Sequence, residues 1–392
     1  MSLVPQKRKT STQEKYQCPI CGNLDPTYIG IRNNHPYCRR CISFRGLEAS
    51  EDYQICDKAD YFLNYELTKE QKILSDRLVD NYRHKINSLV KAVCGSGKTE
   101  IVFAVISYAL KNKHRVGFTV PRRDVIAELY LRFKEVFKNN KVAVLYGGHT
   151  SIIEADLICL TTHQLFRYDQ YFDLLIIDEI DAFPYHDNEV LEAFFQRAVK
   201  GTYIMLSATP SEKVLKKFQK KGMALLELNK RFHGYPLPVP EVIIRKSFLQ
   251  YFELIKQLKD FVSRSKPVFI FCPTIDMCEE TFSFINKFIS GGNYVHSKKS
   301  DRSEVIEDFR KGKYKFLVTT AVLERGVTIK GLQVIIFHAD NVIYDSHALI
   351  QISGRVGRKK ESPTGKVIYI CGEITPEINK SIKEIKHANE SL

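Results

Sequence analysis

The sequence predicts two α/β domains in tandem, each with a mainly parallel sheet, behind a small four-cysteine segment. Three observations support this fold class. Short apolar strands alternate with amphipathic helices along most of the chain. A proline-rich stretch over residues 231–240 interrupts that alternation. Two Cys-x-x-Cys pairs lie near the N-terminus. We expect a basic tail and zinc segment over 1–60, a first domain over 61–230, a linker over 231–245 and a second domain over 246–392.

The composition is that of a globular, basic protein. The chain has 392 residues, 44% of them hydrophobic, and a formal net charge of +14. This excess of positive charge favours a polyanionic partner, either nucleic acid or an anionic membrane surface. No apolar run approaches the roughly 18 residues that a membrane helix needs. The N-terminus carries no apolar signal core, so we expect a cytoplasmic protein without disulfides.

The cysteine pairs predict a structural zinc site. The pairs are Cys18 with Cys21 and Cys38 with Cys41. Four thiolates satisfy a tetrahedral Zn²⁺ and leave no open position for chemistry. The segment between the pairs favours a short β-ribbon that turns at Asn33 and Asn34. It has few apolar residues, so its folding should depend on the metal.

Basic and aromatic side chains are interleaved around these cysteines. They are Arg32, Arg39, Arg40, Arg45, Tyr28, Tyr37 and Phe44. Such a mixture can hold single-stranded nucleic acid by charge and base stacking. It is equally typical of a solvated surface or of a contact with a protein partner, and composition leaves all three interpretations open.

The first domain begins with a candidate helix N-cap and then a phosphate loop. Thr68 is a candidate helix N-cap, and Gln71 follows on the first turn, where its amide could read an adenine edge. Strands are expected over residues 88–93, 115–120, 142–146, 156–160, 172–177 and 202–206, and helices over 100–110 and 125–137. Ligands of such sheets lie beyond the carboxyl ends of the strands.

Residues 91–99, Lys-Ala-Val-Cys-Gly-Ser-Gly-Lys-Thr, form the predicted phosphate loop. Gly95 and Gly97 allow a tight turn whose N–H groups point inward. Lys98 can reach the outer phosphates, and the hydroxyl of Thr99 can bind Mg²⁺. Ala92 stands where the strict motif has glycine.

A carboxylate cluster follows the most apolar strand of the domain. Carboxylates at such a position are costly unless they are paired or bind a metal. Asp178 can hold Mg²⁺, and Glu179 can orient and activate water for attack on a γ-phosphate. Asp181 is then available to couple to neighbours, including the small hydroxyl residues Ser207 and Thr209 after a later strand.

The second domain repeats the α/β alternation without a phosphate loop. Helices are expected over 248–262, 277–288 and 302–311, and strands over 268–271, 294–296 and 315–319. Near its end, Arg355 and Arg358 stand three residues apart, a spacing that places both guanidinium groups on one helix face. Gly354 and Gly357 allow the close approach of a polyphosphate. A contact with ATP at Lys98 then requires the domains to close.

In order along the chain, these motifs resemble those of superfamily 2 helicases, which have two RecA-like domains. The motifs are Gln71, 92–99, 121–122, 161–162, 178–181, 207–209, 319–328 and 351–358. The resemblance implies ATP binding by Gln71, Ala92, Cys94, Gly95, Ser96, Gly97, Lys98, Thr99, Asp178, Gly326, Arg355 and Arg358. It implies catalytic roles for Lys98, Asp178, Glu179, Gln351, Arg355 and Arg358, with Mg²⁺ on Thr99 and Asp178.

The same resemblance implies a nucleic-acid backbone contact at Arg122, Gly148, Thr162, Thr274 and Thr320. Phe62 and Tyr65 are the candidates for the aromatic residue that often stacks on adenine. The tetrad Asp-Glu-Ile-Asp is neither DEAD nor DEAH, which argues against the RNA helicases that bear those names.

A closer resemblance is to the late-competence ComFA family, whose motor is similar to that of the replication-restart helicase PriA. It rests on the four-cysteine segment, Asp-Glu-Ile-Asp-Ala-Phe-Pro and Leu-Glu-Arg-Gly-Val-Thr. It implies a motor that pulls transforming single-stranded DNA through an uptake channel at the cytoplasmic face of the membrane, with partners such as the ComFC family. The alternatives are a repair or replication-restart helicase and a non-catalytic nucleic-acid-binding scaffold.

Overall fold

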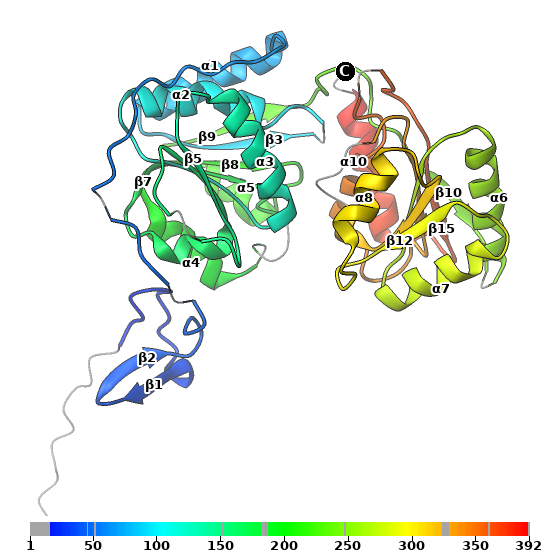
Figure 1. Ribbon diagram of the computed structural model, residues 1–392, viewed down its shortest axis with the longest axis horizontal. Coiled ribbons are helices and arrows are strands. Elements are labelled where there is room, and N and C mark those ends of the chain that lie inside the picture. The colour runs from blue at the N-terminus through cyan, green and yellow to red at the C-terminus, as the bar shows by residue number, and fades with distance from the viewer. Residues whose placement is uncertain are drawn as a thin grey trace, which may run out of the picture.

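The computed structural model describes residues 16–44, 46–50, 52–93, 95–150, 153–181, 185, 187–220, 222–246, 248–323, 329–359 and 361–390. Arg45, Cys94 and Gly326, which the sequence motifs single out, lie outside these residues, as does the N-terminal basic tail. Figure 1 shows two α/β domains side by side and a small N-terminal unit that projects from the first.

The N-terminal unit is a short antiparallel ribbon. A 3-10 turn, η1 (Pro26–Tyr28), leads into β1 (Ile29–Arg32) and β2 (His35–Cys38), which pair antiparallel. Asn33 and Asn34 have φ of +50° and +62°, the left-handed backbone of a two-residue hairpin turn. The expected ribbon and its turn are therefore confirmed.

The first domain has a seven-stranded sheet in the order β5-β6-β4-β7-β8-β3-β9. The strands are β3 (Asn87–Ala92), β4 (Val116–Val120), β5 (Val142–Leu145), β6 (Leu157–Thr161), β7 (Phe172–Asp178), β8 (Val199–Ser207) and β9 (Met223–Leu228). Every strand pair described in this sheet is parallel. All five residues of β4 and of β6 are buried, as expected for central parallel strands covered on both faces.

Helices cover both faces of this sheet. One face packs against α1 (Lys69–Arg83), η2 (Glu100–Val102), α2 (Phe103–Lys111) and α3 (Arg123–Val136). The other face packs against η3 (Thr162–Arg167), α4 (Glu189–Ala198) and α5 (Glu212–Phe218). The zinc-segment cysteines join this second core, which ties the N-terminal unit to the first domain.

The second domain has a six-stranded sheet in the order β10-β15-β14-β11-β13-β12, again with parallel pairs. The strands are β10 (Glu241–Ile244), β11 (Val268–Phe271), β12 (Gly292–Val295), β13 (Phe316–Thr319), β14 (Gln333–Phe337) and β15 (Val367–Cys371). The helices are α6 (Leu249–Ser263), α7 (Ile275–Asn286), α8 (Arg302–Arg310), α9 (Ser346–Ser353) and α10 (Pro376–Glu390), with a 3-10 turn at η4 (Ala321–Leu323).

The structure confirms the expected tandem of parallel α/β domains and adds strands that the pattern did not indicate. β9 and β10 are edge strands with partly exposed residues, and each includes a glutamate, Glu227 or Glu241, beside a short apolar stretch. β10 lies within the range expected for the linker and pairs with β15. The first turn of the helix after the phosphate loop is 3-10, in η2, before α2 begins.

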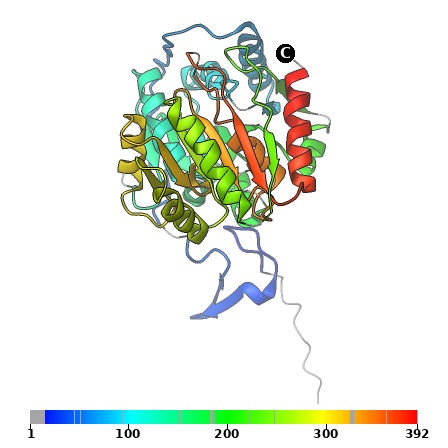
Figure 2. The same ribbon diagram turned by 90° about the vertical axis from the view of Figure 1, so that its right-hand side faces the viewer.

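The linker is held where it passes from one domain to the other. Asn389 of α10 donates from Nδ2 to the carbonyl of Leu237 at 2.9 Å and accepts from its N–H at 2.8 Å. Leu237 also packs with Ile350 and Ile385 in a small apolar cluster. Figure 2, turned by 90°, shows α10 along one side of the second domain. A segment expected to be an extended tether therefore has fixed contacts to the C-terminal helix.

Candidate functional site

The loop between β3 and η2 forms the centre of the candidate site. Gly95 and Gly97 both have φ of +81°, a backbone that glycine adopts without strain. A Cβ on Gly97 would also collide with Nε2 of Gln71. Lys98 and Thr99 follow and lead directly into the helical segment. A strand, a glycine loop and a helix start in this order are the usual protein cradle for phosphate groups.

Gln71 links the start of α1 to this loop. Its Oε1 accepts a hydrogen bond from the N–H of Thr68 at 2.9 Å, and its Nε2 donates to the carbonyl of Ser96 at 2.7 Å. Thr68 in turn accepts from the N–H of Gln71, which completes a capping box and confirms Thr68 as the N-cap. Gln71 is buried and engaged at both ends of its amide, so in this state it contacts the loop itself.

The carboxylates at the end of β7 lie beside the loop lysine. Nζ of Lys98 is 3.8 Å from Oδ1 of Asp178, whose side chain is 9% exposed. The N–H of Glu179 donates to the same Oδ1 at 2.8 Å. Glu179 has φ of +59°, so the chain turns sharply as it leaves the strand. Asp178 and Glu179 are therefore brought next to the phosphate loop, as the strand–loop pattern indicated.

The third carboxylate of the tetrad faces the segment after β8. Asp181 accepts hydrogen bonds from the hydroxyl of Ser207 and from that of Thr209, both at 2.9 Å. Oγ of Ser207 also accepts from the N–H of Thr209 at 3.0 Å. This small network joins the end of β7 to the end of β8, in agreement with the expected coupling of Asp181 to its hydroxyl neighbours.

The second domain contributes cationic side chains to the space beside the phosphate loop. Helix α9 ends at Ser353, with Gly354 as its C-cap, and Gly357 has φ of +71°. The expectation that Arg355 and Arg358 share one helix face is therefore wrong, because both follow the helix end. They are nevertheless brought to one cavity.

That cavity has a volume of about 300 Å³ and is lined from both domains. Its polar lining includes Lys98, Thr99, Asp178, Glu179, Gln351, Arg355 and Arg358. Arg355 is 2% exposed, so its charge is held within the protein. The cationic groups of Lys98, Arg355 and Arg358 suit a polyphosphate, and carboxylate and hydroxyl oxygens are the ligands that Mg²⁺ prefers. The residues present fit ATP with a divalent cation.

The four cysteines of the N-terminal unit form a closed cluster. All four are buried, and their sulfur atoms lie within 4.8 Å of one another. Sγ of Cys18 is 3.5 Å from Sγ of Cys41, and Sγ of Cys21 is 3.7 Å from Sγ of Cys38. Zinc–sulfur bonds of about 2.3 Å in a tetrahedron place sulfur atoms about 3.8 Å apart. The donor set therefore fits a structural Zn²⁺.

The zinc segment is fastened to the first domain beside η3. The ring of Phe44 lies 5.0 Å from that of Phe194 and 6.0 Å from that of His163. Arg40 and Glu189 form an ion pair at 2.7 Å, which is largely solvent-exposed and so contributes little. Phe44 is thus a packing residue, and it is not available for stacking on a base in this state.

Two family models and two relatives match this chain. Residues 64–212 match the family described as "Type III restriction enzyme, res subunit", and residues 251–360 match "Helicase conserved C-terminal domain". "Competence protein ComFA" of Bacillus subtilis (strain 168) is 32% identical, over 96% of this chain and 86% of the relative. "Competence protein ComFA" of Streptococcus pneumoniae (strain ATCC BAA-255 / R6) is 33% identical, over 99% of this chain and 93% of the relative.

The chain belongs to the ComFA family. A solved structure titled "S. cerevisiae Dbp5 bound to RNA and ADP BeF3" aligns with a TM-score of 0.62 at 16% identity, over 81% of this chain and 88% of that one. At this identity the likeness concerns the fold alone, which is that of two RecA-like helicase domains. Together with the helicase family matches, these findings make the ComFA-family chain an ATP-hydrolysing helicase or translocase of superfamily 2.

The expected backbone-contact residues of this ComFA-family chain occupy different environments. Arg122, at the end of β4, donates from Nη1 to the carbonyl of Ala321 at 3.3 Å and so bridges the two domains beside Thr320. Gly148 is exposed, with φ of +84° and open space around it. These positions lie at the C-terminal edges of the two sheets, where a nucleic-acid backbone can be tracked.

Of the two remaining candidates, Thr274 caps a helix and Thr162 is buried. The hydroxyl of Thr274 accepts from the N–H of Met277 at 3.2 Å and caps α7. Thr162 is fully buried at the start of η3. A contact between DNA and the Thr162 hydroxyl would therefore need a change at η3, whereas Thr274 is partly exposed.

Sequence reasoning missed an aromatic group beside Gly148. The rings of Tyr146 and His149 are stacked 5.1 Å apart, and the guanidinium of Arg123 lies 4.6 Å from the Tyr146 ring centre. The turn Tyr-Gly-Gly-His after a strand was the available signal, although only its glycines were singled out. Tyr146 is partly exposed and His149 exposed, and such a stack next to an arginine is a suitable surface for an unpaired base.

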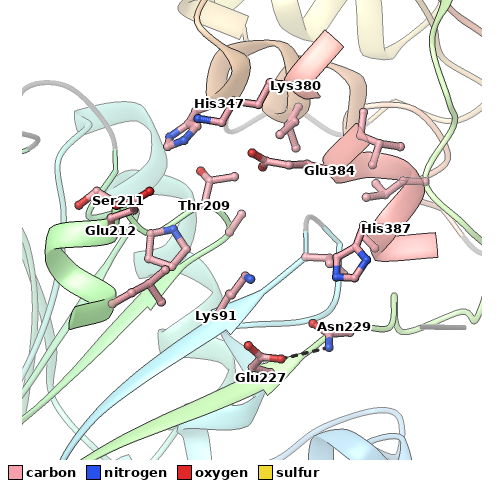
Figure 3. A pocket seen from close by; sticks show the side chains of 18 residues that line it. Lys91, Thr209, Ser211, Glu212, Glu227, Asn229, His347, Lys380, Glu384 and His387 are labelled. Carbon is pink, nitrogen blue, oxygen red and sulfur yellow. Dashed lines mark hydrogen bonds between the residues drawn. The ribbon is translucent and has the colours of Figure 1, made fainter. Parts of the chain in front are cut away.

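A second cavity, of about 400 Å³, lies between the first domain and helices α9 and α10. Figure 3 shows Lys91 and Glu227 on the strands of the first domain, with Glu384 and His387 of α10 across the hollow. It is larger than the cavity at the phosphate loop, but its described lining lacks Lys98, Asp178 and Glu179. The smaller cavity is therefore the candidate site for hydrolysis.

Within the described part of the chain, no helix combines the length and the apolar character needed to cross a bilayer.

Proposed function

We propose that this protein is an ATP-driven motor that moves along single-stranded DNA and takes part in the uptake of transforming DNA. One observation carries the proposal: a single cavity is lined by the phosphate loop and carboxylates of the first domain and by Arg355 and Arg358 of the second. A site divided in this way can convert the loss of a phosphate group into relative movement of the domains. The names of the two relatives suggest a role in competence, and the role in uptake is the proposal's own step beyond them.

Within this proposal the residues have defined roles in hydrolysis. Lys98 binds the outer phosphates of ATP, and Thr99 and Asp178 would hold Mg²⁺. Mg²⁺, when bound, supplies positive charge to the β- and γ-phosphate oxygens. Glu179 orients the attacking water and accepts its proton.

The second domain completes the site. Arg355 and Arg358 offset the charge that develops on the γ-phosphoryl group, a contribution of about 10³–10⁵ in rate for an inserted arginine. Gln351 lines the same cavity, and in this proposal it contacts that group. After hydrolysis and phosphate release, the interaction between the two domains weakens and the cleft opens.

Movement then follows from alternating grip on the DNA backbone. Arg122 and Gly148 of the first domain, with Thr274 and Thr320 of the second, supply the phosphate contacts in this proposal. Binding should be largely independent of sequence and should weaken as salt rises. The ComFC family and the uptake channel are the proposed partners, at the cytoplasmic side of the membrane.

The test is ATP hydrolysis by the purified chain with single-stranded DNA, single-stranded RNA, duplex DNA or no nucleic acid. We expect strong stimulation by single-stranded DNA alone. The Lys98→Ala variant should lose hydrolysis and keep DNA binding, because Lys98 lies in the phosphate cavity and away from the strand-end contacts. Normal turnover by that variant would refute the site, and stimulation by RNA alone would refute the DNA motor.

Strand displacement distinguishes the neighbouring functions. A translocase for uptake should hydrolyse ATP rapidly on single strands without separating a long duplex. A repair or replication-restart helicase should unwind a forked duplex at a rate that follows its hydrolysis.

A further inference from the structure

One buried arginine of the linker contacts loops of both domains. Arg231 is 3% exposed, and its Nη2 donates to the carbonyl of Val356 at 3.0 Å. Val356 lies between Arg355 and Arg358. On its other side, the guanidinium packs against the phosphate loop: a Cβ on Gly95 would lie 3.1 Å from Nε of Arg231. Arg231 therefore occupies the space between the phosphate loop and the arginine-bearing segment.

The next two linker residues make parallel contacts. The N–H of Phe232 donates to the carbonyl of Gly95 at 3.3 Å. Nε2 of His233 is 2.8 Å from the carbonyl of Gly357, and Nδ1 accepts from the N–H of Tyr235 at 3.1 Å. A ring that accepts at Nδ1 and donates at Nε2 is neutral. The linker is thus joined to a loop of each domain at neighbouring residues.

We propose that Arg231 is a positioning residue for hydrolysis, which sets the Arg355–Arg358 segment against the phosphate loop. This inference rests on the proposed function. A guanidinium is planar and rigid, so it can donate to the Val356 carbonyl on one side while its other edge packs against Gly95, which sets the separation of the two loops. A displacement of about 1 Å in a catalytic group can reduce the rate about 10²-fold. Without the Arg231 guanidinium, Arg355 and Arg358 still reach the cavity but are poorly placed for the transition state.

The test measures kcat and KM for ATP with saturating single-stranded DNA. In Arg231→Met, which keeps the length of the side chain, kcat should fall about 10–100-fold while KM changes less than about threefold. Arg231→Lys keeps the charge without the planar guanidinium and should recover only a small part of kcat. A rise in KM with unchanged kcat in either variant would overturn the proposal, because Arg231 would then bind ATP directly.

A double variant decides whether Arg231 acts through Arg355 and Arg358. In an Arg355→Ala background, Arg231→Met should lower kcat by much less than it does in the natural chain. An equal factor in both backgrounds would overturn the proposal. Thermal melting checks that each variant is folded, and if Arg231→Met is not, the kcat and KM of Arg231→Lys decide alone. Lys98→Ala separates the two hypotheses: if it hydrolyses ATP normally the proposed site fails, whereas if only Arg231→Met is normal the positioning role fails.

Discussion

Replacing Gln71 by glutamate separates the two contacts that this side chain makes. Oε1 of Gln71 accepts from the N–H of Thr68 at 2.9 Å, and Nε2 donates to the carbonyl of Ser96 at 2.7 Å. A glutamate at this third helical position can still accept the N-cap N–H, as in the usual capping box. It cannot donate to the Ser96 carbonyl. The substitution therefore removes the contact with the phosphate loop and leaves the helix cap.

The expected size of the effect follows from burial. Gln71 is 4% exposed, so water cannot replace the lost donor, and the Ser96 carbonyl is left without that partner. A buried acceptor without its donor costs about 1–3 kcal/mol. Since about 1.4 kcal/mol is a factor of ten, nucleotide binding should weaken by up to about 5–100-fold, as far as this cost reduces the population of the binding-competent loop.

The assay is equilibrium binding of ADP and GDP to the two variants Gln71→Glu and Gln71→Ala. In each variant the affinities for ADP and for GDP should fall by a similar factor, because the loop binds phosphates and contacts no base. Gln71→Ala also loses the cap contact with Thr68, which contributes about 1 kcal/mol. Its melting temperature should therefore be about 2–4 °C lower than that of Gln71→Glu. A loss confined to ADP would refute this reasoning and support adenine recognition by Gln71. Unchanged affinity in both variants would refute either role.

Two further predictions concern nucleic acid and zinc. Tyr146→Ala should weaken binding of oligo(dT) by about 1–3 kcal/mol, the value of one stacked base, and leave DNA-independent hydrolysis unchanged; fluorescence anisotropy measures the first, and equal affinity would exclude base stacking there. Removal of zinc by a chelator should release one metal ion per chain and expose the ribbon between the cysteine pairs to protease, because β1 and β2 bury few side chains besides the cysteines. If removal of zinc also unfolded both α/β domains, the effect would not be confined to the zinc segment and the prediction would be wrong.

Much of the first domain could be predicted because its signals are local. The phosphate loop needs only a strand, two glycines and a helix start in sequence, and the structure has φ of +81° at both Gly95 and Gly97. The capping box at Thr68 and the turn at Asn33 and Asn34 depend on residues within a few positions of one another. Such features are specified by backbone preference and short-range hydrogen bonds.

The sequence was less informative where an element ends or is half-buried. Helix α9 stops at Ser353, before Arg355, although the spacing of the arginines suggested a continuing helix. β9 and β10 sit at sheet edges with partly exposed residues, and a short apolar run of their length does not by itself distinguish a strand from a helix. Tertiary pairing, rather than local propensity, makes these segments strands.

The sequence by itself determined the family, the order of the motifs and the cysteine donor set, since each single motif consists of residues that are close along the chain. Only the tertiary structure decided that Gln71 supports the loop and that Arg122 reaches Ala321 across the domains. It also decided that Arg231 meets Val356, a residue 125 positions away. The Gln71 contact depends on how α1 packs beside β3, and the other two depend on how the two domains pack. Chain order carries no direct record of which distant side chains such packing brings together.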